Sequence, residues 1–231
     1  MILAFITLCG LGTWQVKRLY WKEALIAKIQ QRTSLAPMEI NNFLDRQMLE
    51  DNWPYSPIMA QGVFDHSKEV YFFTTSKAGQ SGWNVHTPML LNNGKYLIVN
   101  RGFVNYDMRE PEKRLRGQVK GKQVITGFVR VPEKANPNNF FPDNIPAKRE
   151  FYWRDYNKIA ELMGKSEGRE FIPFFVDVNE EPNPGGWPKG GTTIINFPNS
   201  HLQYAVTWYG LALALLGVGG FFLYANRQNH D

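Results

Sequence analysis

The sequence predicts a membrane protein of the α+β class. We expect two transmembrane helices that flank a mostly antiparallel β domain with at least one helix of its own. Apolar runs stand at both ends of the 231-residue chain, and the second has no charged residue from Ala205 to Ala225. Between them, short stretches rich in β-branched and aromatic residues are separated by turn signals, as in β structure. With 43% hydrophobic and 20% charged residues, the composition indicates a folded rather than a disordered chain.

The first apolar run is "MILAFITLCGLGTWQV", residues 1–16, and Lys17 and Arg18 follow it. Sixteen residues rise only about 24 Å, slightly less than the ~30 Å of a hydrocarbon core. The expected explanations are a few missing natural N-terminal residues or a start codon assigned too late. A cleaved signal peptide is the competing interpretation. An uncleaved helix is favoured, because no basic residue precedes the run and no Ala-x-Ala site closes it.

Charge and cysteine content exclude several classes of function. The net charge of +5 is mild and dispersed, which does not indicate a nucleic-acid-binding protein. Cys9 is the single cysteine, so the chain has no intramolecular disulfide and no CxxC redox or copper-transfer site.

The central segment, residues 17–200, is predicted to form the β domain. Its clearest signal is a hairpin of residues 84–91 and 95–104, for which we expect a two-residue turn at Asn93-Gly94 with positive φ. Residues 154–164 form a helical pattern that ends at Gly164, a suitable C-cap. The other expected elements are a strand pair at 55–64 and 69–75, strands at 123–131 and 171–178, and a Pro/Gly loop at 182–191.

Residues 201–225 are predicted to be the second transmembrane helix, with an interfacial start and a short cytoplasmic tail at 226–231. The 21 uncharged residues rise about 32 Å, enough for a full crossing. Small residues at Gly210, Ala214 and Gly217 form a seam on which we expect another helix to pack, and Gly10, Gly12 and Thr13 offer the matching surface. His201 points away from that seam.

Motifs along most of the chain match one known family. They are "LGTWQVKRLYWKEALI" (11–26), "HTPMLLNNGKYLIVNRGFV" (86–104), "FPDN" (141–144), "YWRD" (152–155) and "GGWPKGGTTIINFPNSHLQYAVTWYGLA" (185–212). The chain resembles the Surfeit locus protein 1 family, the assembly factors of haem-copper cytochrome c oxidase. The polar Asn-x-His-Leu-Gln-Tyr string that enters a membrane helix is the most specific part of this resemblance.

The resemblance implies a non-enzymatic protein that binds haem a transiently and aids its insertion into subunit I of the oxidase. Subunit I, haem a synthase and membrane lipid are the implied partners, and nucleic acid is not one. The resemblance also implies a central domain outside the cytoplasm, in the periplasm of bacteria or in the intermembrane space of mitochondria. The sequence has no long Arg/Ser-rich presequence, which favours a bacterial inner-membrane protein with its central domain in the periplasm. The basic residues Lys17, Arg18 and Lys22 on the domain side favour the opposite topology, but large domains cross membranes largely regardless of charge.

His201 is the expected axial ligand to the haem iron, since imidazole is a common haem ligand. Tyr204 and Trp208 are expected to flank the macrocycle, and the small side chains of Ala205 and Ala212 on the same face would leave room for it. The alternative is an ordinary interfacial histidine. Gln15 and Arg18, which share a helix face, are candidates to meet His201 across the helix pair.

Arg101 is the candidate in the domain. It is expected to contact a haem propionate or an anionic partner surface, and the alternative is a structural ion pair or a backbone clamp at the strand end. His66 is expected to be a solvated turn residue and His86 a half-buried structural one. The basic segment 109–122 is expected to be a solvated loop, with attraction to anionic lipid or to an oxidase subunit as the alternative.

Two rival functions remain from the residues alone. One is a scaffold that stabilises an oxidase assembly intermediate without haem. The other is a membrane-anchored hydrolase, which the sequence disfavours because it contains no GxSxG motif.

Overall fold

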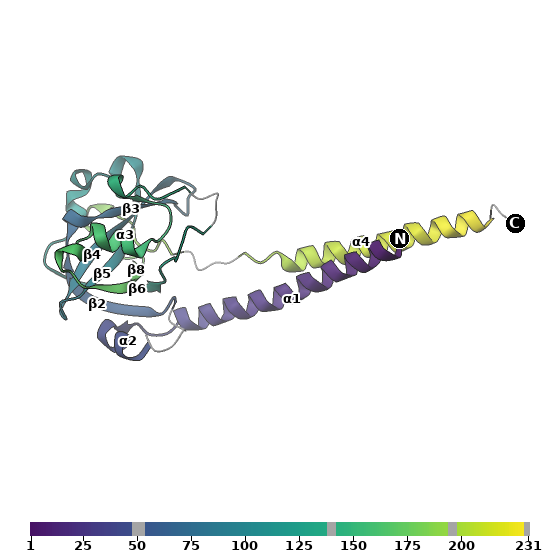
Figure 1. Cartoon of the computed structure of the whole chain (residues 1–231), viewed down its shortest axis with the longest axis horizontal. Helices are drawn as coiled ribbons and strands as arrows, with labels where there is room; N and C mark the ends of the chain where they lie inside the picture. Colours follow the sequence, from purple (N-terminus) through teal and green to yellow (C-terminus); the bar gives the residue numbers. More distant parts are fainter. Residues whose placement is uncertain (48–53, 138–141, 194–197, 229–231) are drawn as a thin grey trace. The chain divides into compact units, whose positions relative to one another are not determined.

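The structure, a computed structural model, describes residues 1–47, 54–137, 142–193 and 198–228. The chain divides into two compact units, coloured by sequence in Figure 1. Met1–Gln31 and Ile195–Asp231 form the first unit, and Arg32–Ile194 forms the second.

The second unit is an eight-stranded sheet with two short helices, α2 (Ile40–Gln47) and α3 (Tyr156–Leu162). Short 3-10 helices connect the strands, among them η1 (His66–Lys68) and η3 (Pro111–Gly117). The strands are β1 (Met38–Glu39), β2 (Pro57–Phe64), β3 (Val70–Thr75), β4 (Ser81–Leu91), β5 (Tyr96–Asn105), β6 (Lys122–Arg130), β7 (Glu150–Phe151) and β8 (Phe171–Val178).

Five of these strands close into a barrel. They follow the order β2-β6-β8-β5-β4, and β4 returns to β2 through the antiparallel pairs from Gly62 with Leu91 to Phe64 with Met89. The long pairings are antiparallel, as predicted, except that β5 and β8 run parallel. The expected strand pair 55–64 and 69–75 is wrong as a pairing, because β2 and β3 each pair with β4 and not with one another.

The β4–β5 hairpin is confirmed, but its turn is one residue longer than predicted. Leu91 and Lys95 close the loop through a backbone hydrogen bond, which leaves Asn92, Asn93 and Gly94 between the strands. Gly94 alone takes a positive φ, of 82°. This corresponds to a three-residue loop with glycine in the left-handed position rather than to a type I′ turn.

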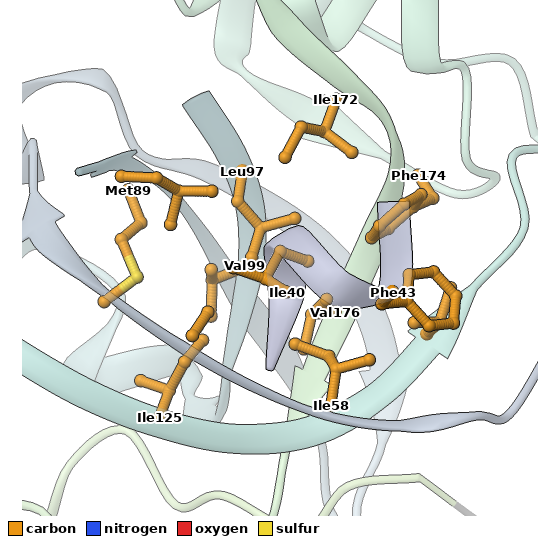
Figure 2. Packing of buried hydrophobic residues seen from close by; sticks show 13 residues of the cluster. Ile40, Phe43, Ile58, Met89, Leu97, Val99, Ile125, Ile172, Phe174 and Val176 are labelled. Atoms are coloured by element: carbon orange, nitrogen blue, oxygen red, sulfur yellow. The ribbon is translucent and has the colours of Figure 1, made fainter. Parts of the chain in front are cut away.

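The main core fills the barrel and the space under α2. Figure 2 shows Phe43 of α2 beside Phe174 of β8, and their rings meet edge to face with centroids 5.6 Å apart. Ile40 and Phe43 are almost fully buried in this core. α2 was not among the elements predicted from the sequence.

The predicted helix at 154–164 is confirmed as α3. The carboxylate of Asp155 caps it by accepting a hydrogen bond from the backbone N–H of Lys158. Gly164 follows the C-cap in the left-handed conformation, as expected. The buried face of α3 carries Ile159 and Ala160, which pack with Phe151 and Phe175 in a second core.

The first unit consists of two long helices, α1 (Ile2–Thr33) and α4 (His201–Gln228). Among the described residues, α4 is the one helix that is long and apolar enough to cross a membrane, over His201–Asn226. Only 6% of the most apolar 18-residue stretch of α4 is buried, whereas the core helix of a soluble domain is mostly buried. The apolar run of residues 1–16 forms only the first half of α1, which continues as a polar helix to Thr33.

The two helices pack antiparallel, and Figure 1 shows them side by side. Lys22 Nζ of α1 bonds the carbonyl oxygen of Pro198, just before α4, at 2.5 Å. At the opposite end, Met1 contacts Gly219 so closely that a Cβ there would clash with the methionine sulfur. Met1 of the chain therefore lies beside the second half of α4.

The predicted glycine seam of α4 is wrong. Gly210 and Gly217 have no atom within 4 Å of where a Cβ would stand. The buried positions of α4 are Ala205 and Ala212, at 3% and 2% exposure. The close approach occurs instead at Gly12 of α1, where the ring of Tyr209 fills the space that a side chain would need.

Candidate functional site

His201 is the first residue of α4, and its side chain is half-buried against α1. Its backbone N–H approaches the side-chain oxygen of Asn199 at 3.4 Å, so the polar residues before the helix serve its free N–H groups. The backbone N–H of Tyr204 then donates to the carbonyl oxygen of Ser200, which closes the first turn of the helix. Helix capping thus fixes the backbone that carries the imidazole.

Gln15 of α1 contacts the His201 ring directly. Nδ1 of His201 lies 2.7 Å from Oε1 of Gln15, and Gln15 is only 8% exposed. Among the described residues, Nε2 of His201 has no hydrogen-bond partner. The predicted contact between Gln15 and His201 is therefore confirmed. Arg18 is engaged elsewhere, since its guanidinium stacks on the ring of Trp21 at 3.9 Å.

The face of α4 below His201 is occupied by α1. Ala205 and Ala212, expected to leave room for a macrocycle, are covered by helix packing. Trp208 is half-buried on the same face, whereas Tyr204 is 56% exposed. The space beside Ala205 and Ala212 is thus used for helix association. Tyr204 is the exposed aromatic neighbour of His201.

Arg101 lies in β5, in the other unit, and is 5% exposed. Its Nη2 donates to the carbonyl of Gly117, and its Nη1 lies 3.7 Å from the carboxylate of Glu69. The guanidinium also stands over the ring of Phe64, 4.9 Å from its centroid. These contacts match the structural alternative for Arg101, an ion pair and backbone clamp. Its expected contact with a haem propionate stays a prediction.

Glu69 is the centre of this buried cluster. Arg114 of η3 donates to Glu69 Oε2 at 2.5 Å, and both side chains are at most 2% exposed. Burial disfavours the charged carboxylate, but hydrogen bonds from His66 and Arg114 outweigh that effect, and the pKa of Glu69 is lowered. Burial also lowers the pKa of Arg101 to about 10.

The prediction for His66 is wrong, and that for the basic segment 109–122 is confirmed only in part. His66 is not a solvated turn residue, because its Nε2 bonds the carbonyl of Val119 at 2.9 Å and its Nδ1 faces Glu69 and Arg101. The segment is not simply a solvated loop, because Arg114 within it is buried. Sequence reasoning missed Glu69 and Arg114, and a strand-end glutamate 45 residues from its arginine gives no local signal.

His86 is fully buried rather than half-buried. Its ring packs against Phe72 at a tilt of 39° with centroids 4.1 Å apart, and it meets Phe175 edge on. Its Nε2 is buried without a hydrogen-bond partner among the described residues. Burial lowers the pKa of His86 to about 3, so the ring is neutral in the folded domain.

The described residues contain no group of three or more His, Cys, Asp and Glu side chains that could hold a metal ion. Among the three described histidines, His201 is the one with a ring nitrogen that lacks a hydrogen-bond partner outside the buried core.

Comparison with known proteins places the chain in a family. The SURF1 family model matches residues 2–213. The human Surfeit locus protein 1 is 36% identical over 230 residues, which cover 93% of this chain and 73% of that protein. The proteins of Gallus gallus and Takifugu rubripes are 38% and 34% identical, each over 93% of this chain and over 71% and 91% of their own lengths. The chain therefore belongs to the SURF1 family.

Proposed function

We propose that this protein is a non-catalytic membrane assembly factor of cytochrome c oxidase that holds haem a at His201 and aids its insertion into subunit I. Membership of the SURF1 family supports the role in oxidase assembly. One observation carries the haem assignment: His201 stands at the start of an apolar helix with Nδ1 bonded to Gln15 and Nε2 unpaired among the described residues.

The donor chemistry at this position fits haem. A neutral imidazole bonded through Nδ1 offers the Nε2 lone pair, and haem iron accepts such a nitrogen as an axial ligand. His201 would hold the iron through Nε2, and Tyr204 is the exposed aromatic side chain in the same turn. A site at the end of α4 also suits a lipid-soluble cofactor with charged propionates, since its apolar part would stay in the bilayer.

The packing of α1 restricts this proposal. Ala205 and Ala212 are buried in the helix pair, so the haem macrocycle cannot pack against that face of α4. Arg101 lies in the other compact unit and is 5% exposed, so none of the contacts described for His201 involves it. The set that supports haem binding is therefore His201 and Tyr204, with Trp208 half-buried beside them.

The partners proposed are subunit I of the oxidase as recipient, haem a synthase as donor and membrane lipid around the helix pair. The exposed apolar surface of α4 supports the lipid contact. The proposed location is a bacterial inner membrane with the β domain in the periplasm; the relatives named above are animal proteins and give this location no support.

A haem-independent scaffold is the second candidate. The use of Ala205 and Ala212 for helix association favours it, because a scaffold needs only a stable helix pair and a folded domain. Under this alternative His201 and Gln15 would join the two helices and bind no cofactor.

The visible spectrum of the purified protein distinguishes haem carriage from the haem-independent scaffold. The full chain should be isolated from cells that make haem a and from cells that make only haem b. We expect haem a bands in the first preparation at a reproducible ratio to protein. A colourless protein that still copurifies with subunit I would refute haem carriage and support the scaffold.

A further inference from the structure

A hydrogen bond between the Gln15 side chain of α1 and the His201 imidazole of α4 joins the two helices. The oxygen of the Gln15 carboxamide faces Nδ1 at 2.7 Å, a short hydrogen bond, and the glutamine is buried in the interface. A carboxamide oxygen only accepts, so Nδ1 must carry the proton. In a neutral imidazole this leaves Nε2 without a proton.

We infer that Gln15 is a positioning residue that holds His201 in the Nδ1–H tautomer, so that Nε2 is presented as the ligand atom. The inference rests on the proposed haem function for its use, but the tautomer itself is a property of the protein without haem. Metal-binding histidines commonly donate their other N–H to a neighbouring acceptor, which fixes the ring orientation and raises the basicity of the ligand.

Neighbouring contacts fix the helix register that brings the two side chains together. Gly12, one turn before Gln15, admits the ring of Tyr209. The hydroxyl groups of Thr13 and Tyr209 lie 3.0 Å apart. On the other side of Gln15, Lys22 bonds the carbonyl of Pro198. The contact of Gln15 with His201 is thus held between two further contacts between the same segments.

Three variants distinguish an effect on the tautomer of His201 from an effect on helix packing. Gln15→Leu removes the acceptor at similar volume, and Gln15→Glu keeps an acceptor at the same length. Thr13→Val is the matched control, because it removes the hydroxyl contact with Tyr209 in the same interface without touching His201.

The first measurement uses the full chain without haem, in nanodiscs, with ¹⁵N-labelled histidine. Long-range ¹H–¹⁵N correlation spectra report which ring nitrogen is protonated, and loss of a signal in His201→Ala assigns it among the four histidines. We expect the Nδ1–H tautomer in the wild type, in Gln15→Glu and in Thr13→Val, and a shift toward Nε2–H in Gln15→Leu. An Nε2–H ring in the wild type, or no change in Gln15→Leu, would overturn the inference.

The second measurement adds haem a to the same samples. Gln15→Leu should bind it about 10- to 100-fold more weakly, as is typical when the hydrogen-bond partner of a metal ligand is lost. Gln15→Glu should bind well and have a lower reduction potential, because a carboxylate makes the imidazole more electron-rich. Equal affinity and potential in all variants would overturn the positioning role. If the wild type binds no haem a, the proposed function fails, and the spectra without haem still decide the tautomer.

Discussion

Replacing Glu69 tests the buried charge cluster most severely. Glu69→Gln keeps the shape of the side chain and removes its charge. Arg114 and Arg101, at 1% and 5% exposure, would then be left as buried cations near a neutral amide. Removing one partner of a buried ion pair costs about 3–5 kcal/mol, because the remaining charge is uncompensated. Arg101 keeps its hydrogen bond to Gly117, which favours the lower end of that range.

The free energy of unfolding should be measured by urea titration of the full chain in detergent, followed by far-UV circular dichroism and tryptophan fluorescence. The matched control is Glu180→Gln, because Glu180 pairs with Lys77 at 3.5 Å and both side chains are more than 60% exposed. Such a surface pair contributes about 0–1 kcal/mol.

We expect Glu69→Gln to lower the unfolding free energy by at least about 2 kcal/mol more than Glu180→Gln does. Glu69→Gln combined with Arg114→Leu should recover part of the loss, because it removes one of the uncompensated charges. Equal effects of Glu69→Gln and Glu180→Gln would show that the cluster does not stabilise β5, η1 and η3.

Three further predictions concern the domain and the topology. His86 has a pKa of about 3 in the folded domain and about 6.5 unfolded, so the unfolded chain binds more protons between these values and stability falls as the pH drops through this window. From pH 6.5 to 5.5 the wild type should lose about 1 kcal/mol more than His86→Leu in urea titrations, and parallel losses would contradict the assignment. Gly94→Val should cost about 1–2 kcal/mol from backbone strain alone, because no atom lies within 4 Å of its Cβ position, whereas an unchanged urea midpoint would contradict the loop geometry. A periplasm-active reporter should be active when fused at Pro137 and silent after Arg227, and the reverse pattern would refute the domain-out topology.

Local signals predicted the elements that local chemistry determines. The Asp155 cap and Gly164 delimit α3, and Gly94 turns the β4–β5 hairpin. The closure of the barrel was not predictable in this way, because the pairing of β2 with β4 and the parallel pairing of β5 with β8 join distant segments. The Glu69–Arg114 pair escaped notice for the same reason.

The helix pair shows both the strength and the limit of pattern reasoning. The shared face of Gln15 and Arg18 pointed to His201, and the structure confirms this for Gln15. The glycine seam was wrong because small residues permit close packing on any face, while the large ring of Tyr209 opposite Gly12 selects the register. Hydropathy marked the apolar part of α1, but the helix continues to Thr33 because residues 17–33 are mostly good helix formers.

The proposal that His201 binds haem a is tested most directly by the haem a content of the purified His201→Ala protein, from cells that make haem a, beside wild type and Gln203→Ala. Gln203 is an exposed neighbour in the same helical turn and serves as the control. His66→Ala is unsuitable as a control, because His66 belongs to the Glu69 cluster and its loss should destabilise the domain.

Alanine preserves the helix, so His201→Ala should still insert and fold, which circular dichroism checks. If His201 is the axial ligand, haem a per protein should fall on the order of tenfold or more in His201→Ala, with loss of the wild-type visible bands. It should stay at the wild-type level in Gln203→Ala. A His201→Ala protein with a full complement of haem a and an unaltered spectrum would contradict the account.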